Sequence, residues 1–145
     1  MIDSFTDDYA FLSNFYEHPF EYGGVLWPTA EHAFQASKVD PDHPDWECYI
    51  DLFLEAKSPG LAKKLGRTVP LDPDWEEIKD SVMKDILMAK FEDVELQRLL
   101  YETGDQQLIE GNNWGDRYWG QVNGEGKNRL GELLMEVRFY YEIPY

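Results

Sequence analysis

The spacing of hydrophobic residues is most regular between residues 72 and 93, where it has the period of a helix. The regularly spaced residues are Trp75, Ile78, Val82, Met83, Ile86 and Leu87. Intervals of three and four residues place side chains on one face of a helix. Asp72 followed by Pro73 is a typical helix start, because aspartate caps the first turn and proline lacks an N–H that would need a partner there. The segment therefore predicts a long amphipathic helix.

Shorter patterns of the same period predict five further helices. They are expected over residues 30–39, 46–56, 59–65 and 94–102, and from about residue 128 onward. Thr29 and Ser58 are suitable N-caps for the first and third of these, and Gly66 and Gly104 are suitable stops. Two segments look like strands: a small hairpin around Gly23 and Gly24, and the short stretch 107–111.

Helices thus dominate, with a few short strands, and the predicted fold class is α+β. The chain has 145 residues, which is enough for one domain with a sizeable core and too few for two ordinary domains. We therefore predict one compact domain over residues 1–145. No internal repeat is present.

The formal net charge of −16 argues against broad, salt-sensitive binding to nucleic acid. A local basic pocket for a small phosphorylated ligand remains compatible with this charge, because salt screens distant charges beyond about 8 Å. Its candidate members are Lys38, Lys57, Lys63, Lys64, Arg67, Lys127, Arg129 and Arg138.

Three observations predict a cytoplasmic protein without a membrane partner. No apolar stretch reaches the length of a membrane span, and the acidic start of the chain is unlike a secretion signal. A lone cysteine, Cys48, cannot form an internal disulfide, which fits a reducing compartment.

The helix predicted after Thr29 carries the first candidate site. Glu31, Gln35 and Lys38 share one helix face, and Phe15 and Trp27 are candidates for aromatic surface beside it. A carboxylate in such surroundings can have a shifted pKa and take part in chemistry. The alternative is a solvated polar stripe whose charges contribute only a few tenths of a kcal/mol.

His32 lacks a histidine or cysteine at metal-ligand spacing, and we expect it to be buried and hydrogen-bonded. No metal site is predicted. A carboxylate site for magnesium stays open in principle, because acidic residues are abundant, yet no group of them stands out.

A glycine-rich loop before the last helix carries the second candidate site. Gly120, Gly124 and Gly126 allow amide groups to converge on an anion near the helix start at about Asn128. The spacing fits neither a P-loop nor a dinucleotide fingerprint, and an ordinary surface loop is the alternative.

In the same loop Asp116 precedes Trp119 by three residues. The pair could bind a ribose hydroxyl and stack on a base or a sugar. A structural tryptophan with a capping aspartate is the other interpretation.

Several segments in order resemble the NADAR family of YbiA-like N-glycosidases over nearly the whole chain. They are "FLSNF", "WPTAEHAFQASK", "DWEEIKDSVMKDILMAKF", "TGDQQLIEG", "DRYWG" and "GKNRLGELLMEVR". The resemblance implies a mostly helical α+β domain that hydrolyses a C–N glycosidic bond without a redox cofactor. It implies two groups of substrates: phosphoribosylamino-pyrimidine intermediates of riboflavin biosynthesis, and ADP-ribose linked to a base such as guanine in nucleic acid.

The resemblance also implies roles for individual residues. Glu31 corresponds to the catalytic carboxylate, and Asp116 to the second acidic residue. The substrate-binding residues that the resemblance implies are Trp75, Trp119, Asn14, Gln35 and Lys38. This chain departs from many relatives at Ala30 and Ala33, where they have serine and tyrosine, and in the insertion "QVN" after "WG".

Together these observations predict that Glu31 activates water or stabilises an oxocarbenium-like cation at the ribose. Asp116 is expected to hold ribose hydroxyls or share that work, and Trp75 and Trp119 to sandwich base or ribose. Phosphate is expected to be held by Lys38 together with Arg67 or Lys127. The expected partner is a small phosphorylated ribosyl substrate, and nucleic acid only when it carries an ADP-ribosylated base. A non-catalytic module that binds ADP-ribose and a structural protein are the competing interpretations.

Overall fold

The structure is a computed structural model that describes residues 1–142. In it the chain forms two structural units. One unit is the continuous segment 14–89, and the other combines residues 1–13 with the chain from residue 90 onward. The α+β class is confirmed, because helices form most of the regular structure and the one sheet has two strands among the described residues. The prediction of a single domain over residues 1–145 stays a prediction.

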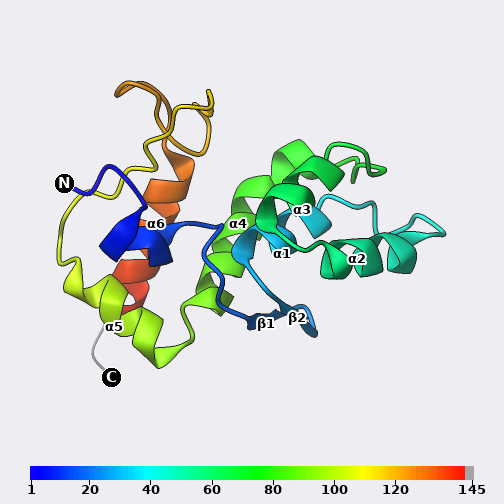
Figure 1. Cartoon of the computed structure of the whole chain (residues 1–145), viewed down its shortest axis with the longest axis horizontal. Helices are drawn as coiled ribbons and strands as arrows, with labels where there is room; N and C mark the ends of the chain where they lie inside the picture. The colour runs from blue at the N-terminus through cyan, green and yellow to red at the C-terminus, as the bar shows by residue number, and fades with distance from the viewer. Residues whose placement is uncertain (143–145) are drawn as a thin grey trace. The chain divides into compact units, whose positions relative to one another are not determined.

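The first unit contains a hairpin and four helices. They are β1 (Phe20–Tyr22), β2 (Val25–Trp27), α1 (Ala30–Ala36), α2 (Trp46–Glu55), α3 (Pro59–Leu65) and α4 (Trp75–Lys90), whose last residue belongs to the other unit. Helix α1 packs against α2, α3 and β2 (Figure 1). The short helix α1 is therefore covered by neighbours from several directions.

The hairpin forms where the glycine pair predicted it. β1 and β2 are antiparallel, with Phe20 opposite Trp27. Gly23 and Gly24 have φ angles of 62° and 79°, a left-handed pair that suits a two-residue turn and that residues with a Cβ rarely adopt. The turn is closed by Trp27, whose indole N–H donates to the carbonyl of Tyr22 at 3.2 Å.

Helix α1 is buried at all seven positions, and it ends three residues earlier than predicted. Thr29 caps it as expected, because its side chain accepts a hydrogen bond from the backbone N–H of His32. The predicted end at residue 39 is wrong, since Val39 forms an isolated antiparallel bridge with Leu71. That pairing requires extended backbone, which a continuing helix cannot supply.

The other predicted helices of this unit are confirmed. The Ser58 side chain accepts from the backbone N–H of Leu61 at 3.1 Å, which caps α3 at its proline-containing first turn. Gly66 follows α3, but its φ of −60° is right-handed, so it does not end the helix in the left-handed conformation typical of glycine.

The second unit contains a 3₁₀ helix, η1 (Asp7–Leu12), and the helices α5 (Val94–Glu102) and α6 (Arg129–Glu142), with α5 packed on α6 (Figure 1). The sequence pattern missed η1, because six residues are too few to display a helical period. The strand predicted at 107–111 is wrong. Only isolated parallel bridges form there, between Ile2 and Leu108 and between Gly111 and Gln121.

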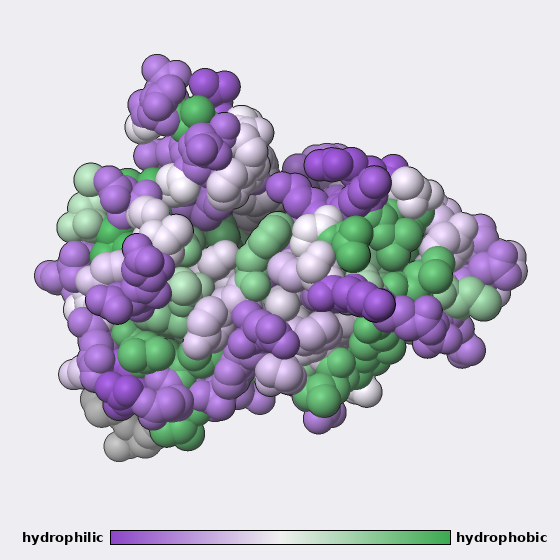
Figure 2. Space-filling view, viewed as in Figure 1, coloured by the Kyte–Doolittle hydropathy of each residue, from purple (hydrophilic) through white to green (hydrophobic). Residues whose placement is uncertain are grey.

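Hydrophilic side chains cover much of the face shown in Figure 2, interrupted by separate hydrophobic patches. This agrees with the large negative net charge of the sequence. No helix among residues 1–142 is both long enough and apolar enough to cross a membrane.

Lys90, the last residue of α4, is buried with 1% of its surface exposed. Its ammonium group donates to the backbone carbonyls of Phe11 at 2.7 Å and Ser13 at 2.9 Å. Burial lowers the pKa of Lys90 from 10.5 to about 7, because an apolar environment disfavours the charged form.

This burial makes stability depend on pH in a predictable direction. Between pH 7 and 10.5 the unfolded chain holds the Lys90 proton more tightly than the folded chain does, so the free energy of unfolding should rise with pH in that window. The slope that Lys90 adds to the free energy of unfolding can reach about 1.4 kcal/mol per pH unit in this window and should vanish below pH 7. Urea unfolding of wild type and Lys90→Met from pH 6 to 10 measures it as the difference in slope. Equal slopes in the two proteins would contradict the prediction.

Candidate functional site

The polar face of α1 is buried, and on it a carboxylate accepts a hydrogen bond from a side-chain amide. Glu31 is 7% exposed and Gln35 is 4% exposed. The side-chain Nε2 of Gln35 donates to Oε1 of Glu31 at 2.8 Å, one helical turn away. The interpretation of this face as a solvated stripe is therefore wrong. A carboxylate withdrawn from water needs such a donor, since burial of an unpaired charge is very costly.

Asn14 meets the same helix turn. Its backbone carbonyl accepts a hydrogen bond from the N–H of Glu31 at 3.0 Å, and its side-chain Nδ2 donates to the sulfur of Met83 at 3.4 Å. Two buried acceptors nearby have no hydrogen-bond partner in the described structure: Oδ1 of Asn14 and Oε1 of Gln35. Each such atom costs roughly 1–3 kcal/mol, which is tolerated more often at functional sites than elsewhere.

The predicted aromatic Trp75 packs onto α1 from the start of α4. Its ring centroid lies 5.1 Å from that of Phe34, with the two planes tilted by 54°. The ammonium nitrogen of Lys38 lies 6.0 Å from the Phe34 centroid, so it shares this aromatic surface. Trp75 itself is 5% exposed.

Lys38 is the electrostatic centre of this group. Burial lowers its pKa, the charge of Glu31 opposes that change, and the nearby cations lower the pKa further. These cations are Arg67, Lys63 and Lys79. In a chain with a net charge of −16, three further positive side chains thus lie near enough to Lys38 to affect its pKa.

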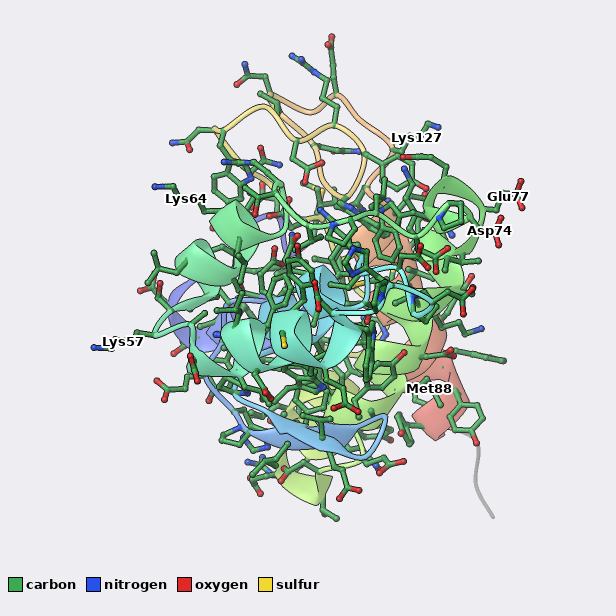
Figure 3. All side chains as sticks on the ribbon, turned by 90° about the vertical axis from the view of Figure 1, so that its right-hand side faces the viewer. Lys57, Lys64, Asp74, Glu77, Met88 and Lys127 are labelled. Carbon is green, nitrogen blue, oxygen red and sulfur yellow. The ribbon has the colours of Figure 1, made fainter. Side chains whose placement is uncertain are left out.

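The remaining lysines of the predicted basic pool in this unit lie elsewhere. Lys57 and Lys64 are exposed, and Figure 3 shows both side chains extending outward from the ribbon.

His32 is buried and hydrogen-bonded, as predicted. Its Nδ1 lies 2.7 Å from the hydroxyl of Thr29, and its Nε2 lies 2.9 Å from the carbonyl of Ala56. Both ring nitrogens are therefore engaged in holding α1. Within residues 1–142 no three His, Cys, Asp or Glu side chains form a group able to hold a metal ion.

Asp116, in the second unit, organises its own loop. One carboxylate oxygen accepts hydrogen bonds from the backbone N–H groups of Tyr118 at 3.0 Å and Trp119 at 2.9 Å. The side chain of Asn112 clamps the backbone of Asp116 from the other side, as acceptor at 3.1 Å and donor at 2.9 Å. This is the capping geometry that the sequence left open, and the predicted contact of Asp116 with substrate stays a prediction.

The predicted amide cradle for phosphate before α6 is wrong. The backbone N–H groups of residues 127, 128, 129 and 130 donate to carbonyls of residues 117, 120, 118 and 119. Asn128 is equally committed, since its side chain donates to the carbonyl of Leu108 and accepts from the N–H of Glu110, both at 2.9 Å. Lys127 lies over the ring of Tyr118, with its nitrogen 5.3 Å from the centroid.

The last two cations of the predicted pool have structural partners in the same unit. Buried Arg138 donates to the Thr103 hydroxyl at 3.0 Å and to the Gln106 carbonyl at 2.8 Å, while Arg129 pairs with Glu132 at 3.0 Å.

The structure therefore divides the predicted site residues into two groups. In unit 14–89 it brings together Asn14, Glu31, Gln35, Lys38, Arg67 and Trp75. The other unit contains Asp116, Trp119 and Lys127. Three residues that contact or influence the first group were not among the predicted site residues: Lys79 was not singled out, and Gly66 and Met83 were given only structural roles.

A separate, largely apolar pocket of about 240 Å³ lies beside the hairpin in unit 14–89, with Tyr22, Trp27, Trp46 and Ile50 in its lining. None of the predicted site residues lines it.

The chain is similar to several known proteins. Residues 3–140 match the NADAR domain. A Shigella boydii protein named N-glycosidase YbiA is 44% identical over 139 residues, which cover 93% of this chain and 83% of that protein. A riboflavin biosynthesis protein of Vibrio vulnificus is 34% identical over 136 residues, which cover 91% of this chain and 35% of that longer protein.

A solved structure is also similar. The NMR structure of Escherichia coli YbiA superposes with a TM-score of 0.82 at 40% sequence identity, and the match covers 100% of this chain and 90% of the other.

The electrostatics of Lys38 can be tested directly. Because the charge of Glu31 opposes the lowering of the Lys38 pKa, Glu31→Gln should lower that pKa further, and Arg67→Ala should raise it. An NMR titration of the lysine side chains measures both changes, with exposed Lys57 as the internal reference. An unchanged Lys38 pKa in Glu31→Gln would show that the two groups are not coupled.

Proposed function

This chain belongs to the NADAR family, and on that premise we propose that it hydrolyses the C–N bond between a phosphorylated ribose and an amino-pyrimidine or guanine-type base. The general class follows from the relatives: the chain is an N-glycosidase, a hydrolase acting on N-glycosyl bonds. The identity of the base and of the phosphorylated ribose is the part that we propose.

The observation that carries the proposal is the buried carboxylate of Glu31, which accepts a hydrogen bond from Gln35 and interacts electrostatically with Lys38. Cleavage of a ribosyl C–N bond passes through a state with positive charge at the anomeric carbon. A carboxylate fixed in a poorly hydrated site stabilises that charge strongly, because it does not have to reorient when the charge develops.

The reaction adds one water across the bond. Water attacks the anomeric carbon and gives up a proton, the C–N bond breaks, and the nitrogen of the departing base takes a proton. Glu31 accepts the proton of water or stabilises the cation. The unpaired oxygen of Asn14 is an acceptor suited to a donor of the substrate, such as a ribose hydroxyl.

The cations around Lys38 support a phosphorylated sugar as the substrate. Lys63 lies in the last turn of α3, Arg67 is the second residue after that helix, and Lys79 lies on α4. All of them influence Lys38, so an anion bound there meets positive charge from several elements. Such charge-assisted contacts are among the strongest polar interactions in proteins.

Between the two substrate groups, we favour a free metabolite such as a riboflavin-biosynthesis intermediate. The net charge of −16 repels long polyphosphates, and a similar relative carries a riboflavin biosynthesis name. An ADP-ribosylated guanine in an unpaired strand is the alternative, with the nucleic acid directed away from the protein.

The proposal extends to Trp75 and to the location of the protein. Trp75 would form one aromatic wall of the substrate site, while the roles of Asp116, Trp119 and Lys127 stay predictions. We also propose a cytoplasmic location, for which the exposed single cysteine is suited to a reducing compartment.

Replacement of Glu31 tests the mechanism. Glu31→Gln keeps size and hydrogen-bonding capacity but removes the charge, so kcat should fall by about 10²- to 10³-fold while the fold is retained. Release of base from a phosphoribosylamino-pyrimidine and from an ADP-ribosylated guanosine oligonucleotide, followed by mass spectrometry, measures turnover and identifies the substrate. Glu47→Gln, an exposed carboxylate on α2, is the matched control and should keep full activity.

A near-normal rate in Glu31→Gln would remove Glu31 from the mechanism. Binding of ADP-ribose by calorimetry, with no cleavage of either substrate by wild type, would instead favour the binding-module interpretation.

The phosphate contact can be separated from the chemistry. Arg67→Ala should raise KM by about 10-fold for the phosphorylated substrate, because a hydrogen bond to a charged group contributes about 1.5–3 kcal/mol. Arg67→Ala should leave KM for the dephosphorylated substrate unchanged. Lys64 lies three residues away, and its side chain extends outward (Figure 3). Lys64→Ala should therefore change KM for neither substrate. An equal loss on both substrates would rule out a phosphate role for Arg67.

A further inference from the structure

Gly66, directly after α3, is buried against the side chain of Gln35. A Cβ built on Gly66 would lie 1.9 Å from Oε1 and 2.9 Å from Cδ of Gln35. Both distances are far below a normal contact between non-bonded atoms. The amide of Gln35 therefore occupies the space that any other residue at position 66 would need.

The backbone at this position does not itself require glycine. Gly66 has φ −60° and ψ −18°, a right-handed conformation open to every residue, and its N–H donates to the carbonyl of Ala62 at 2.9 Å. This differs from Gly23 and Gly24 of the hairpin, whose φ angles are positive. The reason for glycine at position 66 is therefore the neighbouring side chain.

The orientation of the Gln35 amide follows from its two neighbours. Nε2 must face Glu31, because a carboxylate oxygen accepts hydrogen bonds and would repel the amide oxygen. Oε1 then faces Gly66, where it has no hydrogen-bond partner. Only a residue without a side chain leaves room for this arrangement.

We propose that Gly66 is a positioning residue of the active site, which fixes Gln35 and through it the carboxylate of Glu31. Helix α3 packs on α1, so this close approach makes the geometry of the carboxylate depend on the end of a neighbouring helix. The catalytic consequence rests on the proposed N-glycosidase reaction. The structural part, the placement of the Gln35 amide by Gly66, does not.

Gly66→Ala should displace the Gln35 amide and lower kcat by about 10- to 100-fold, with KM changed less than about 2-fold, since misplacement of a catalytic group by about 1 Å has effects of this size. The acidic limb of the pH–rate profile should also move to higher pH, because a hydrogen bond donated to a carboxylate favours its ionised form. Gly60→Ala is the matched control. It lies within α3 and its Cβ would meet only the Ser58 hydroxyl at 3.9 Å, so activity should stay normal.

A double variant distinguishes positioning from a general packing defect. Gln35→Ala removes the side chain that Gly66 accommodates, so adding Gly66→Ala to Gln35→Ala should change kcat by less than about 2-fold. The same loss in both backgrounds would overturn the proposal, as would wild-type kcat and pH profile in Gly66→Ala alone.

An NMR measurement separates this proposal from the proposed reaction. In ¹⁵N-labelled protein the side-chain NH₂ signals of Gln35 should shift in Gly66→Ala and in Glu31→Ala, and should keep their positions in Gly60→Ala. Unshifted signals in Gly66→Ala overturn the positioning role even if the enzyme is active. If the signals shift in Gly66→Ala but the wild type cleaves no N-glycosyl bond, the positioning role is supported and the proposed reaction is contradicted.

Discussion

The structure of unit 14–89 depends on one constraint: the carboxylate of Glu31 is buried, on a seven-residue helix that is buried at every position. Such a charge needs hydrogen bonds, and Gln35 supplies one from the next turn. The surrounding features serve the same requirement. The side chains of Thr29 and His32 fix the start of the helix. The carbonyl of Asn14 accepts a hydrogen bond from the backbone N–H of Glu31, and Gly66 leaves room for the side chain of Gln35.

Charge is distributed on two scales in this protein. The net charge is strongly negative, yet Lys38 lies within the influence of Arg67, Lys63 and Lys79. Local cations dominate inside a partly buried site, because water and salt screen the distant acidic surface. Under the proposed function, a small phosphorylated substrate would be attracted at short range, whereas a long polyanion would be repelled by the acidic surface.

The sequence could predict what depends on local rules. Caps at Thr29 and Ser58, the glycine turn at residues 23 and 24, and the period of α4 all act within a few residues, and each is confirmed. Features that depend on distant partners were missed. α1 ends early because Val39 pairs with Leu71, and the loop amides before α6 bind carbonyls rather than an anion. The role of Gly66 depends on Gln35, thirty-one residues earlier in the sequence, and no local pattern signals it.

The position of Lys90 has a consequence for how this chain could be recombined. The chain enters segment 14–89 after Ser13 and leaves it before Lys90, and the ammonium group of Lys90 donates to the Ser13 carbonyl. The segment is therefore an insertion whose entry and exit are tied together by one side chain. Exchange with the corresponding segment of a relative would therefore need to keep the hydrogen bond between Lys90 and Ser13.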